Sequence, residues 1–163
     1  MKHLVLLGIM WLCGLMTVVA QNIPQVIPAL QQWKPAKGKM VLPESGKVII
    51  SSDEEGALKQ SAEILVQDLK EMFGWNYRVV IGKQEKGAVF LTLSKPDKTL
   101  GDEGYRMDVR NGVTIEAPTA KGVFWGTRTL LQMIHNQPEG LMRGQAIDFP
   151  LYPNRGFMID VVA

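Results

Sequence analysis

Short stretches rich in Val, Ile, Leu and Phe recur along the chain between Pro, Gly, Ser and Asn, a pattern that predicts β-strands joined by turns. Within residues 88–94 alternate positions are apolar, and we expect this strand to lie centrally in a sheet. Residues 21–37 contain Pro24, Pro28 and Pro35, which favour an extended lead-in segment over a surface. The other predicted strands are residues 39–42, 47–50, 77–81, 145–149 and 156–159, the first two being joined by a turn at 43–46.

The clearest local pattern is a β-hairpin at residues 105–109 and 113–117, which flank Asn111 and Gly112. Asn-Gly tolerates the positive φ angles of a type I′ turn, so we expect that turn here. Side chains alternate between the two faces of a strand, which predicts one buried and one solvent-facing set. The predicted buried set is Tyr105, Met107, Val109, Val113, Ile115 and Ala117, and the solvent-facing set is Arg106, Asp108, Thr114 and Glu116.

Two amphipathic helices are predicted from apolar residues at steps of three and four. The first has a capping-box pair, Ser52 and Glu55, at its start and Gly74 as its left-handed end. The second is capped by Thr119 and ends near Pro138, and its Gly122 and Gly126 indicate close packing against a neighbouring backbone. The apolar stripes are Leu58, Ala62, Leu65, Leu69 and Met72 in the first helix, and Val123, Thr127, Leu130, Leu131 and Ile134 in the second.

The first twenty residues have the pattern of a secretory signal peptide, with Lys2 and His3 before an apolar run that closes at Ala20. The run is shorter than the roughly 20 apolar residues of a membrane-spanning helix, so we expect cleavage after Ala20 and no stable membrane span. The predicted location is outside the cytoplasm, in the periplasm or the extracellular space. The single cysteine, Cys13, lies in this segment, so the mature domain is expected to be stable without disulfides.

Composition and charge narrow the classes of function. The 163 residues are 46% hydrophobic and 21% charged, which is ordinary for a globular protein. The net charge of +2 is scattered along the chain and predicts no nucleic-acid partner. His3 and His135 are the only histidines, and neither zinc-ligand spacings nor a Gly-x-Ser-x-Gly elbow occur. We therefore predict no metal, no cofactor and no serine or cysteine triad, and a zinc protease is disfavoured.

Two adjacent acids, Asp102 and Glu103, are the remaining candidates for acid–base chemistry on a sugar. They lie between Gly101 and Gly104 in the turn that enters the hairpin, where solvated acids are common. We assign them to the turn, so no catalytic residue is predicted in the chain.

Three stretches together resemble the family 20 β-N-acetylhexosaminidases, a family of glycoside hydrolases. They read Gly-Tyr-Arg-Met-Asp-Val at 104–109, Gly-Val-Phe-Trp-Gly-Thr-Arg-Thr-Leu-Leu-Gln at 122–132 and Arg-Gly-Phe-Met-Ile-Asp at 155–160. The resemblance implies an α+β fold, a small β-sheet with two helices packed on one face, similar to the zincin-like N-terminal domain of that family. After the signal peptide at 1–20, it further implies a noncatalytic N-terminal domain at 21–151 and the start of a (β/α)8 barrel at 152–163. Because the last strand begins without a stop signal or polar tail after it, we expect the chain to be truncated at Ala163.

The same resemblance implies the function. The family removes terminal N-acetylhexosamine residues from glycans by substrate-assisted retaining hydrolysis. Arg155 matches an arginine that binds hydroxyls of the terminal sugar, although Asn154 stands where an aromatic residue is frequent. Asp160 matches a motif aspartate that either orients substrate-binding groups or is purely structural. The catalytic Asp-Glu pair lies further along the barrel in the family, so this fragment is expected to be inactive and to support its own barrel.

The alternative is a stand-alone exported module that binds carbohydrate or another protein without catalysis. Such a module requires exposed aromatic side chains arranged as a platform for sugar rings. The candidates are Trp33, Trp75 and Trp125. We expect Trp75 and Trp125 to be packed, and Trp33 is left open. If the domain instead supports a barrel, it is expected to expose an apolar surface.

Overall fold

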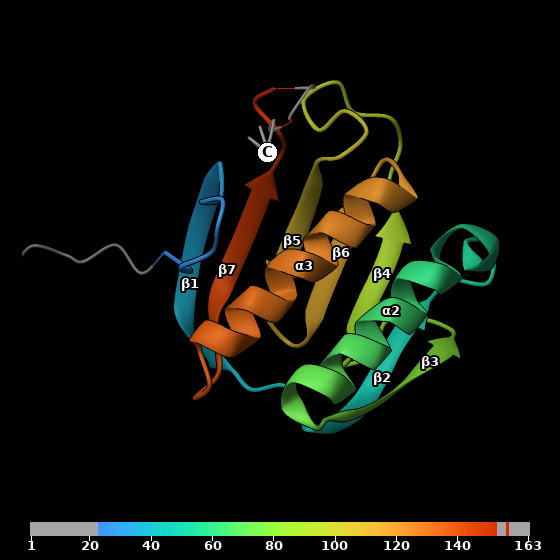
Figure 1. The fold of residues 1–163 in the computed structure, drawn as a ribbon, viewed down its shortest axis with the longest axis vertical. Coiled ribbons are helices and arrows are strands. Elements are labelled where there is room, and N and C mark those ends of the chain that lie inside the picture. The colour runs from blue at the N-terminus through green and yellow to red at the C-terminus, as the bar shows by residue number, and fades with distance from the viewer. Residues whose placement is uncertain (1–22, 153–155, 157–163) are drawn as a thin grey trace, which may run out of the picture.

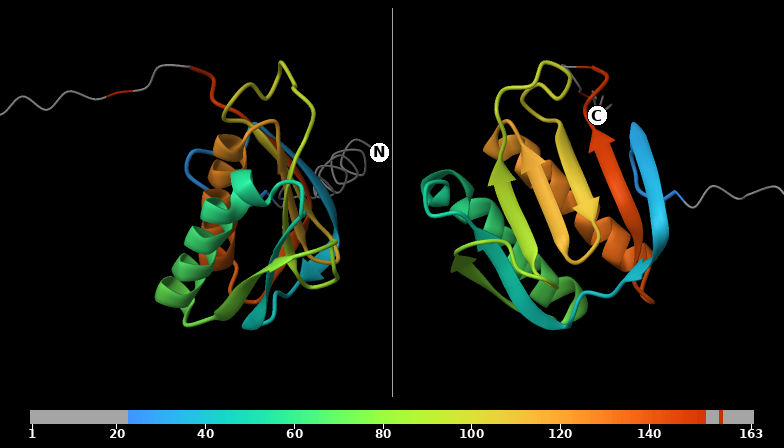
Figure 2. Two further views of the ribbon diagram at one scale, coloured as in Figure 1. Left: turned by 90° about the vertical axis from the view of Figure 1, so that its right-hand side faces the viewer. Right: turned by 180° about the vertical axis from the view of Figure 1, so that it is seen from behind.

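The computed structural model describes residues 23–152 and 156, which form one mixed β-sheet and two helices. Helix α2, Glu55–Phe73, and helix α3, Ala120–Asn136, lie side by side on one face of the sheet (Figure 1). The opposite face carries no helix of the described chain (Figure 2). This is the α+β arrangement predicted above. In spatial order the strands are β1 (Gln32–Met40), β7 (Leu141–Asp148), β5 (Tyr105–Val109), β6 (Val113–Ala117), β4 (Val89–Leu93), β2 (Ser45–Ile50) and β3 (Asn76–Ile81).

The sheet contains both parallel and antiparallel pairs of strands. β2 pairs in parallel with β3 and β4, and β4 pairs in parallel with β6, whereas β5 runs antiparallel to both β6 and β7. A parallel pair requires a long crossover, and α2 provides it between β2 and β3. β4 has a parallel neighbour on each side, which confirms the interior position predicted for this strand.

The hairpin is confirmed in its strands and face pattern but not in its turn. β5 and β6 pair from Arg106 with Glu116 to Val109 with Val113, and the predicted buried set is at most 1% exposed. The connection is three residues long, 110–112, and Gly112 does not have a positive φ, so the type I′ turn is wrong. Gly112 is required for another reason: a Cβ atom there lies 2.6 Å from the carbonyl oxygen of Ala88. The backbone of Gly87 and Ala88, just before β4, approaches the turn too closely for a side chain.

The first helix starts differently from the prediction. Its N-cap is Glu54, without a side-chain capping bond, so the capping box of Ser52 and Glu55 is wrong. The Glu54 carboxylate instead accepts hydrogen bonds from the backbone N–H of Leu93, at 2.9 Å, and the Thr92 hydroxyl, at 3.1 Å. A tertiary contact with the end of β4 therefore fixes this end of α2.

The apolar faces of both helices build the core against β2, β4, β5 and β6. Leu58, Ala62, Leu65 and Leu69 are fully buried, whereas Met72, which we expected on this stripe, is 54% exposed. Gly74 ends α2 in the left-handed conformation, with φ of 73°, as predicted. The predicted stripe of α3 is buried throughout, and the Thr119 hydroxyl accepts a hydrogen bond from the backbone N–H of Gly122 at 3.1 Å.

The N-terminal part of the described chain joins the sheet, which the sequence did not predict. Residues 32–37 were assigned to an extended lead-in, yet they form most of edge strand β1, paired with β7 and interrupted between Pro35 and Lys39. Proline is tolerated there because an edge strand has one unpaired side. The two strands expected on either side of residues 43–46 lie near opposite edges of the sheet. Searched for membrane spans, the described residues contain no helix with the necessary length and hydropathy.

Tyr77 on β3 makes alkaline pH a specific test of the fold. Burial raises the pKa of Tyr77 to about 12, and its hydroxyl donates to the carbonyl oxygen of Pro43 at 2.8 Å. Because the folded pKa lies above the unfolded value of about 10, this stabilisation is complete below pH 10 and is lost between pH 10 and about 12. We expect Tyr77 to lower the free energy of unfolding by about 1.4 kcal/mol between pH 9 and 11. Urea unfolding at both pH values checks this, and Tyr77→Phe should reduce the loss by that amount.

Candidate functional site

The two predicted substrate contacts, Arg155 and Asp160, lie outside the described residues, as does most of the predicted barrel strand. Their roles stay predictions. The described chain reaches Tyr152 just before them, so the surface around Tyr152 is the part of the structure nearest in sequence to the predicted substrate contacts.

At this point the surface has a hollow of about 440 Å³, which we call the exit hollow. It lies between the segment before β1, helix α3 and the residues that follow β7. The side chains of Ile27, Trp125, Leu151 and Tyr152 line it while remaining 85%, 41%, 67% and 71% exposed, respectively. The rest of the lining consists of Pro28, Ala29, Gln31, Glu103, Tyr105, Arg128, Thr129, Gln132, Asp148, Phe149 and Pro150.

A buried polar network forms the floor of the exit hollow. The Tyr105 hydroxyl lies 2.6 Å from Thr129 Oγ1 on α3 and donates to Asp148 Oδ2 at 3.1 Å. The other carboxylate oxygen of Asp148 accepts from the backbone N–H of Gln31 at 3.2 Å. Burial raises the pKa of Tyr105, and the Asp148 carboxylate adds to the shift, so the phenol stays neutral. A neutral, hydrogen-bonded phenol is suited to holding β5, α3 and β7 together, and not to acting as a base.

Helix α3 also holds the N-terminal segment that forms one wall. The Gln132 side chain accepts from the backbone N–H of Ile27 at 2.8 Å and donates to the carbonyl oxygen of the same residue at 3.1 Å. One turn further along, Asn136 Nδ2 donates to the carbonyl oxygen of Gln25 at 2.7 Å. This wall is therefore fixed by paired hydrogen bonds to a helix.

Arg128 joins helices α2 and α3 at the edge of the exit hollow. Its guanidinium donates to Asp68 on α2 at 2.5 Å and lies over the ring of Phe124, 4.7 Å from the ring centre. Both Arg128 and Asp68 have side chains that are 25% exposed. The pair joins the two helices beside Trp125, so the exit hollow has a fixed cation at its edge.

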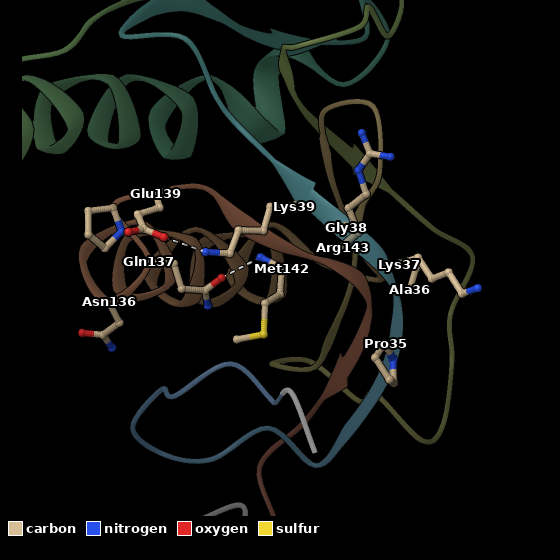
Figure 3. Close-up of a pocket in the computed structure, with 11 residues that line it drawn as sticks. Pro35, Ala36, Lys37, Gly38, Lys39, Asn136, Gln137, Glu139, Met142 and Arg143 are labelled. Carbon is tan, nitrogen blue, oxygen red and sulfur yellow. Dashed lines mark hydrogen bonds and ion pairs between the residues drawn. The ribbon is translucent and has the colours of Figure 1, made fainter. Parts of the chain in front are cut away.

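A second hollow, of about 870 Å³, lies at the other end of β7 (Figure 3). It is an open depression between the interruption in β1 and the turn after α3. Lys39 and Glu139 point toward one another across it and form an ion pair at 3.1 Å, and Gln137 Oε1 accepts from the backbone N–H of Met142 at 2.6 Å. Figure 3 shows Lys37 directed away from this ion pair, so the cations do not gather around one ligand position.

The hairpin entry is held to the start of α3 by the side chain of Glu103 and by the backbone of Asp102. Glu103 pairs with Lys121 at the start of α3 at 2.5 Å, and its side chain is only 15% exposed. The backbone carbonyl of Asp102 accepts from the Thr119 hydroxyl at 2.5 Å. Within residues 23–152 and 156, no three His, Cys, Asp or Glu side chains come together in a way that could hold a metal ion.

The three tryptophans considered as a platform for sugar rings differ in how far they are packed. Trp33 packs over Gly144 and against the core, and Trp75 stacks on Tyr77 with ring centres 6.0 Å apart. Trp125 was expected to be packed, and that prediction is wrong, because it stands at the surface of α3 and lines the exit hollow. The helical spacing could have indicated that Trp125 is exposed. Trp125, Arg128 and Gln132 follow one another at steps of three and four, on a face beside the buried stripe.

Comparison with known proteins decides the family. The sequence model of glycosyl hydrolase family 20, domain 2, matches residues 23–149, which is most of the chain. The chain belongs to glycosyl hydrolase family 20. Among curated relatives of this family 20 chain, a lacto-N-biosidase of Bifidobacterium bifidum is 30% identical over 135 residues, which are 82% of the chain and 12% of the relative. A β-hexosaminidase of Porphyromonas gingivalis is 29% identical over 147 residues, covering 83% of the chain and 18% of the relative.

Solved structures give the same result for the fold. The N-acetyl-β-hexosaminidase of Streptomyces plicatus superposes with a TM-score of 0.66 and 26% identity, over 81% of the family 20 chain and 27% of the solved chain. The β-N-acetylhexosaminidase of Streptomyces coelicolor gives a TM-score of 0.63 at 28% identity, over 77% and 26% of the two chains. The family 20 chain thus spans less than a third of each of these relatives and corresponds to their N-terminal domain.

Proposed function

We propose that this chain is the N-terminal part of an exported β-N-acetylhexosaminidase, which removes terminal N-acetylhexosamine residues from glycans by substrate-assisted retaining hydrolysis. One observation carries the proposal: the match to the family 20 domain ends at residue 149, and the motif Arg-Gly-Phe-Met-Ile-Asp follows at 155–160. Domain and motif stand in the order that the family resemblance requires.

In this proposal Arg155 binds the non-reducing terminal sugar. A guanidinium presents several N–H donors in a fixed plane, which suits two neighbouring hydroxyl oxygens better than a lysine amine does. Asp160, five residues further along the same predicted strand, orients groups around the sugar. In this mechanism the acetamido oxygen of the substrate attacks the anomeric carbon, so the protein needs an acid for the leaving oxygen and an aspartate for the acetamido group. Both belong to the barrel beyond this chain.

The domain itself supports the barrel. Glu103 at the hairpin entry is paired with Lys121, and the residues of the Tyr105 network are held in hydrogen bonds between elements. Residues 1–20 direct export, after which the enzyme acts in the periplasm or outside the cell on glycans that it meets there.

The test compares hydrolysis by two proteins. The gene is read beyond Ala163 and the longer product is assayed for release of a chromogenic aglycone from a β-N-acetylglucosaminide, beside the present chain. We expect turnover by the longer protein and none by the 163-residue chain. A longer product without N-acetylhexosaminidase activity, or a stop codon directly after Ala163, would contradict the proposal and favour the stand-alone binding module.

A further inference from the structure

The turn between β5 and β6 contains an Asn-Gly pair whose asparagine has no structural role. Close packing requires Gly112, whereas no contact of the fold requires the side chain of Asn111. The chain has five asparagines, and Asn111 alone among them is followed by glycine. Asn111 is exposed and Gly112 is buried against the backbone before β4, but both line a surface hollow of about 540 Å³. Water therefore reaches the peptide bond that joins them.

We propose that Asn111 is a site of spontaneous deamidation in the folded protein. In this reaction the backbone nitrogen of Gly112 loses its proton and attacks Cγ of the Asn111 side chain. The new bond between this nitrogen and Cγ closes a succinimide ring. The bond between Cγ and Nδ2 breaks, and Nδ2 takes up a proton and leaves as ammonia. Water then opens the ring at either carbonyl, which leaves aspartate or isoaspartate at position 111, so water is the only co-reactant.

Both reacting groups are free of competing hydrogen bonds. Among the residues that the structure describes, the N–H of Gly112 has no acceptor and the side-chain amide of Asn111 has no hydrogen-bond partner. Asn136 differs, because its Nδ2 donates to the carbonyl oxygen of Gln25 at 2.7 Å. Glycine also lacks the Cβ atom that would stand beside the attacking nitrogen in any other residue. The sequence and the hydrogen bonds thus both select Asn111.

One hydrogen bond of the turn favours the ionised form of the attacking group. The backbone N–H of Gly87 donates to the carbonyl oxygen of Asn111 at 2.6 Å. When the nitrogen of Gly112 loses its proton, the negative charge is shared with this oxygen, because both atoms belong to one conjugated peptide group. A donor that already points at the oxygen stabilises the developing charge without reorganisation. The contact that holds the turn against the chain before β4 therefore also assists the reaction.

The two products differ in their effect on the hairpin. Aspartate leaves the backbone unchanged and adds a negative charge at an exposed position. In isoaspartate the backbone runs through the former side chain and is longer by one methylene group, and the former main-chain carbonyl becomes a free carboxylate. The extra length must fit where even a Cβ atom on Gly112 would lie 2.6 Å from the carbonyl oxygen of Ala88. We therefore expect isoaspartate, and not aspartate, to loosen this end of the hairpin.

The test incubates the folded 163-residue chain in mildly alkaline buffer and locates deamidation by proteolytic digestion and mass spectrometry. We expect the mass shift from amide to acid to accumulate at Asn111 at least about tenfold faster than at Asn76 or Asn136. Asn111→Gln is the matched control, because it keeps the amide but closes a larger ring more slowly, so it should stay unmodified. Incubation in guanidinium chloride gives the rate for the unfolded chain, and the folded rate should lie within about threefold of it.

Two results would overturn the proposal. One is a shift at Asn111 that accumulates no faster than at Asn76. The other is a folded rate more than about threefold below the unfolded rate, because the fold would then protect the asparagine. The effect on the hairpin is measured separately, by urea unfolding of the isoaspartate form after ion-exchange chromatography. This form should unfold at a lower urea concentration than Asn111→Asp, and equal midpoints would show that the longer backbone is accommodated without loss.

Discussion

Under the proposed function, replacing Arg155 with alanine in the longer protein is expected to lower kcat/KM for a chromogenic N-acetylglucosaminide by about a hundredfold or more. A hydrogen bond from a charged group contributes about 1.5–3 kcal/mol, and two of them to sugar hydroxyls together exceed the roughly 2.7 kcal/mol of a hundredfold change. The loss should appear mainly as a higher KM, with kcat little changed, because in the proposed function Arg155 binds the sugar hydroxyls as strongly in the ground state as in the transition state. Steady-state kinetics over a range of substrate concentrations measure both.

The control for Arg155 is Arg78→Ala. Arg78 is an exposed arginine on edge strand β3, so its loss should leave kcat/KM unchanged. Arg155→Lys should recover only a small part of the activity, because a single amine cannot reproduce the planar donor pair. Activity of Arg155→Ala within a factor of about three of wild type would remove Arg155 from the substrate site.

Replacing Gly122 with valine destabilises the domain by about 3 kcal/mol. A Cβ atom at this position lies 2.4 Å from the carbonyl oxygen of Gly104 and 2.8 Å from the Ala117 methyl group. The first of these is backbone at the entry of β5 and the second is a buried residue at the end of β6, so neither side can yield without moving the sheet away from α3. Urea unfolding of the 163-residue chain, followed by circular dichroism, measures the loss.

Gly56→Val is the matched control for Gly122→Val. Gly56 also lies in the first turn of a helix, but a Cβ atom there meets nothing within 4 Å. Valine has a slightly better helix propensity than glycine, so this variant should stay within about 0.5 kcal/mol of wild type. Equal destabilisation by the two substitutions would show that valine is costly in the first turn of either helix, and that close packing against Gly104 does not account for the glycine at 122.

The predictions that succeeded rest on local periodicity. Alternation in residues 105–109 and 113–117 assigned every side chain of the hairpin to its face, and the three- and four-residue steps assigned the buried stripes of both helices apart from Met72. The predicted capping box was wrong although its residues were in the right order. Glu54 is the N-cap instead, and its carboxylate accepts hydrogen bonds from Thr92 and Leu93, which are distant in sequence. The predicted type I′ turn was wrong in a similar setting, because the backbone of Gly87 and Ala88, which precede β4, packs against Gly112.

The candidate site was predicted less completely than the fold. The resemblance pointed to Arg155 and Asp160, and the expected exposed apolar surface is present at the exit hollow. Trp125 was assigned to the core, since an aromatic residue between core positions of a helix is usually packed. Its side chain lies beside the buried stripe and is 41% exposed. The network of Tyr105, Thr129 and Asp148 carried no sequence signal, because its members are 24 and 43 residues from Tyr105.

The sequence by itself predicted both helices, the hairpin strands and their buried faces, because these follow from the spacing of neighbouring residues, and three short motifs indicated the family by resemblance. Only the tertiary structure decided that β1 and β2 stand near opposite edges of one sheet, that Glu54 begins α2, and that Ile27, Trp125, Leu151 and Tyr152 share one hollow. Such contacts join residues distant in sequence, so they depend on how the helices pack on the sheet. Which strands and side chains pair with one another depends on all of the core contacts together, and no single stretch of sequence contains them all.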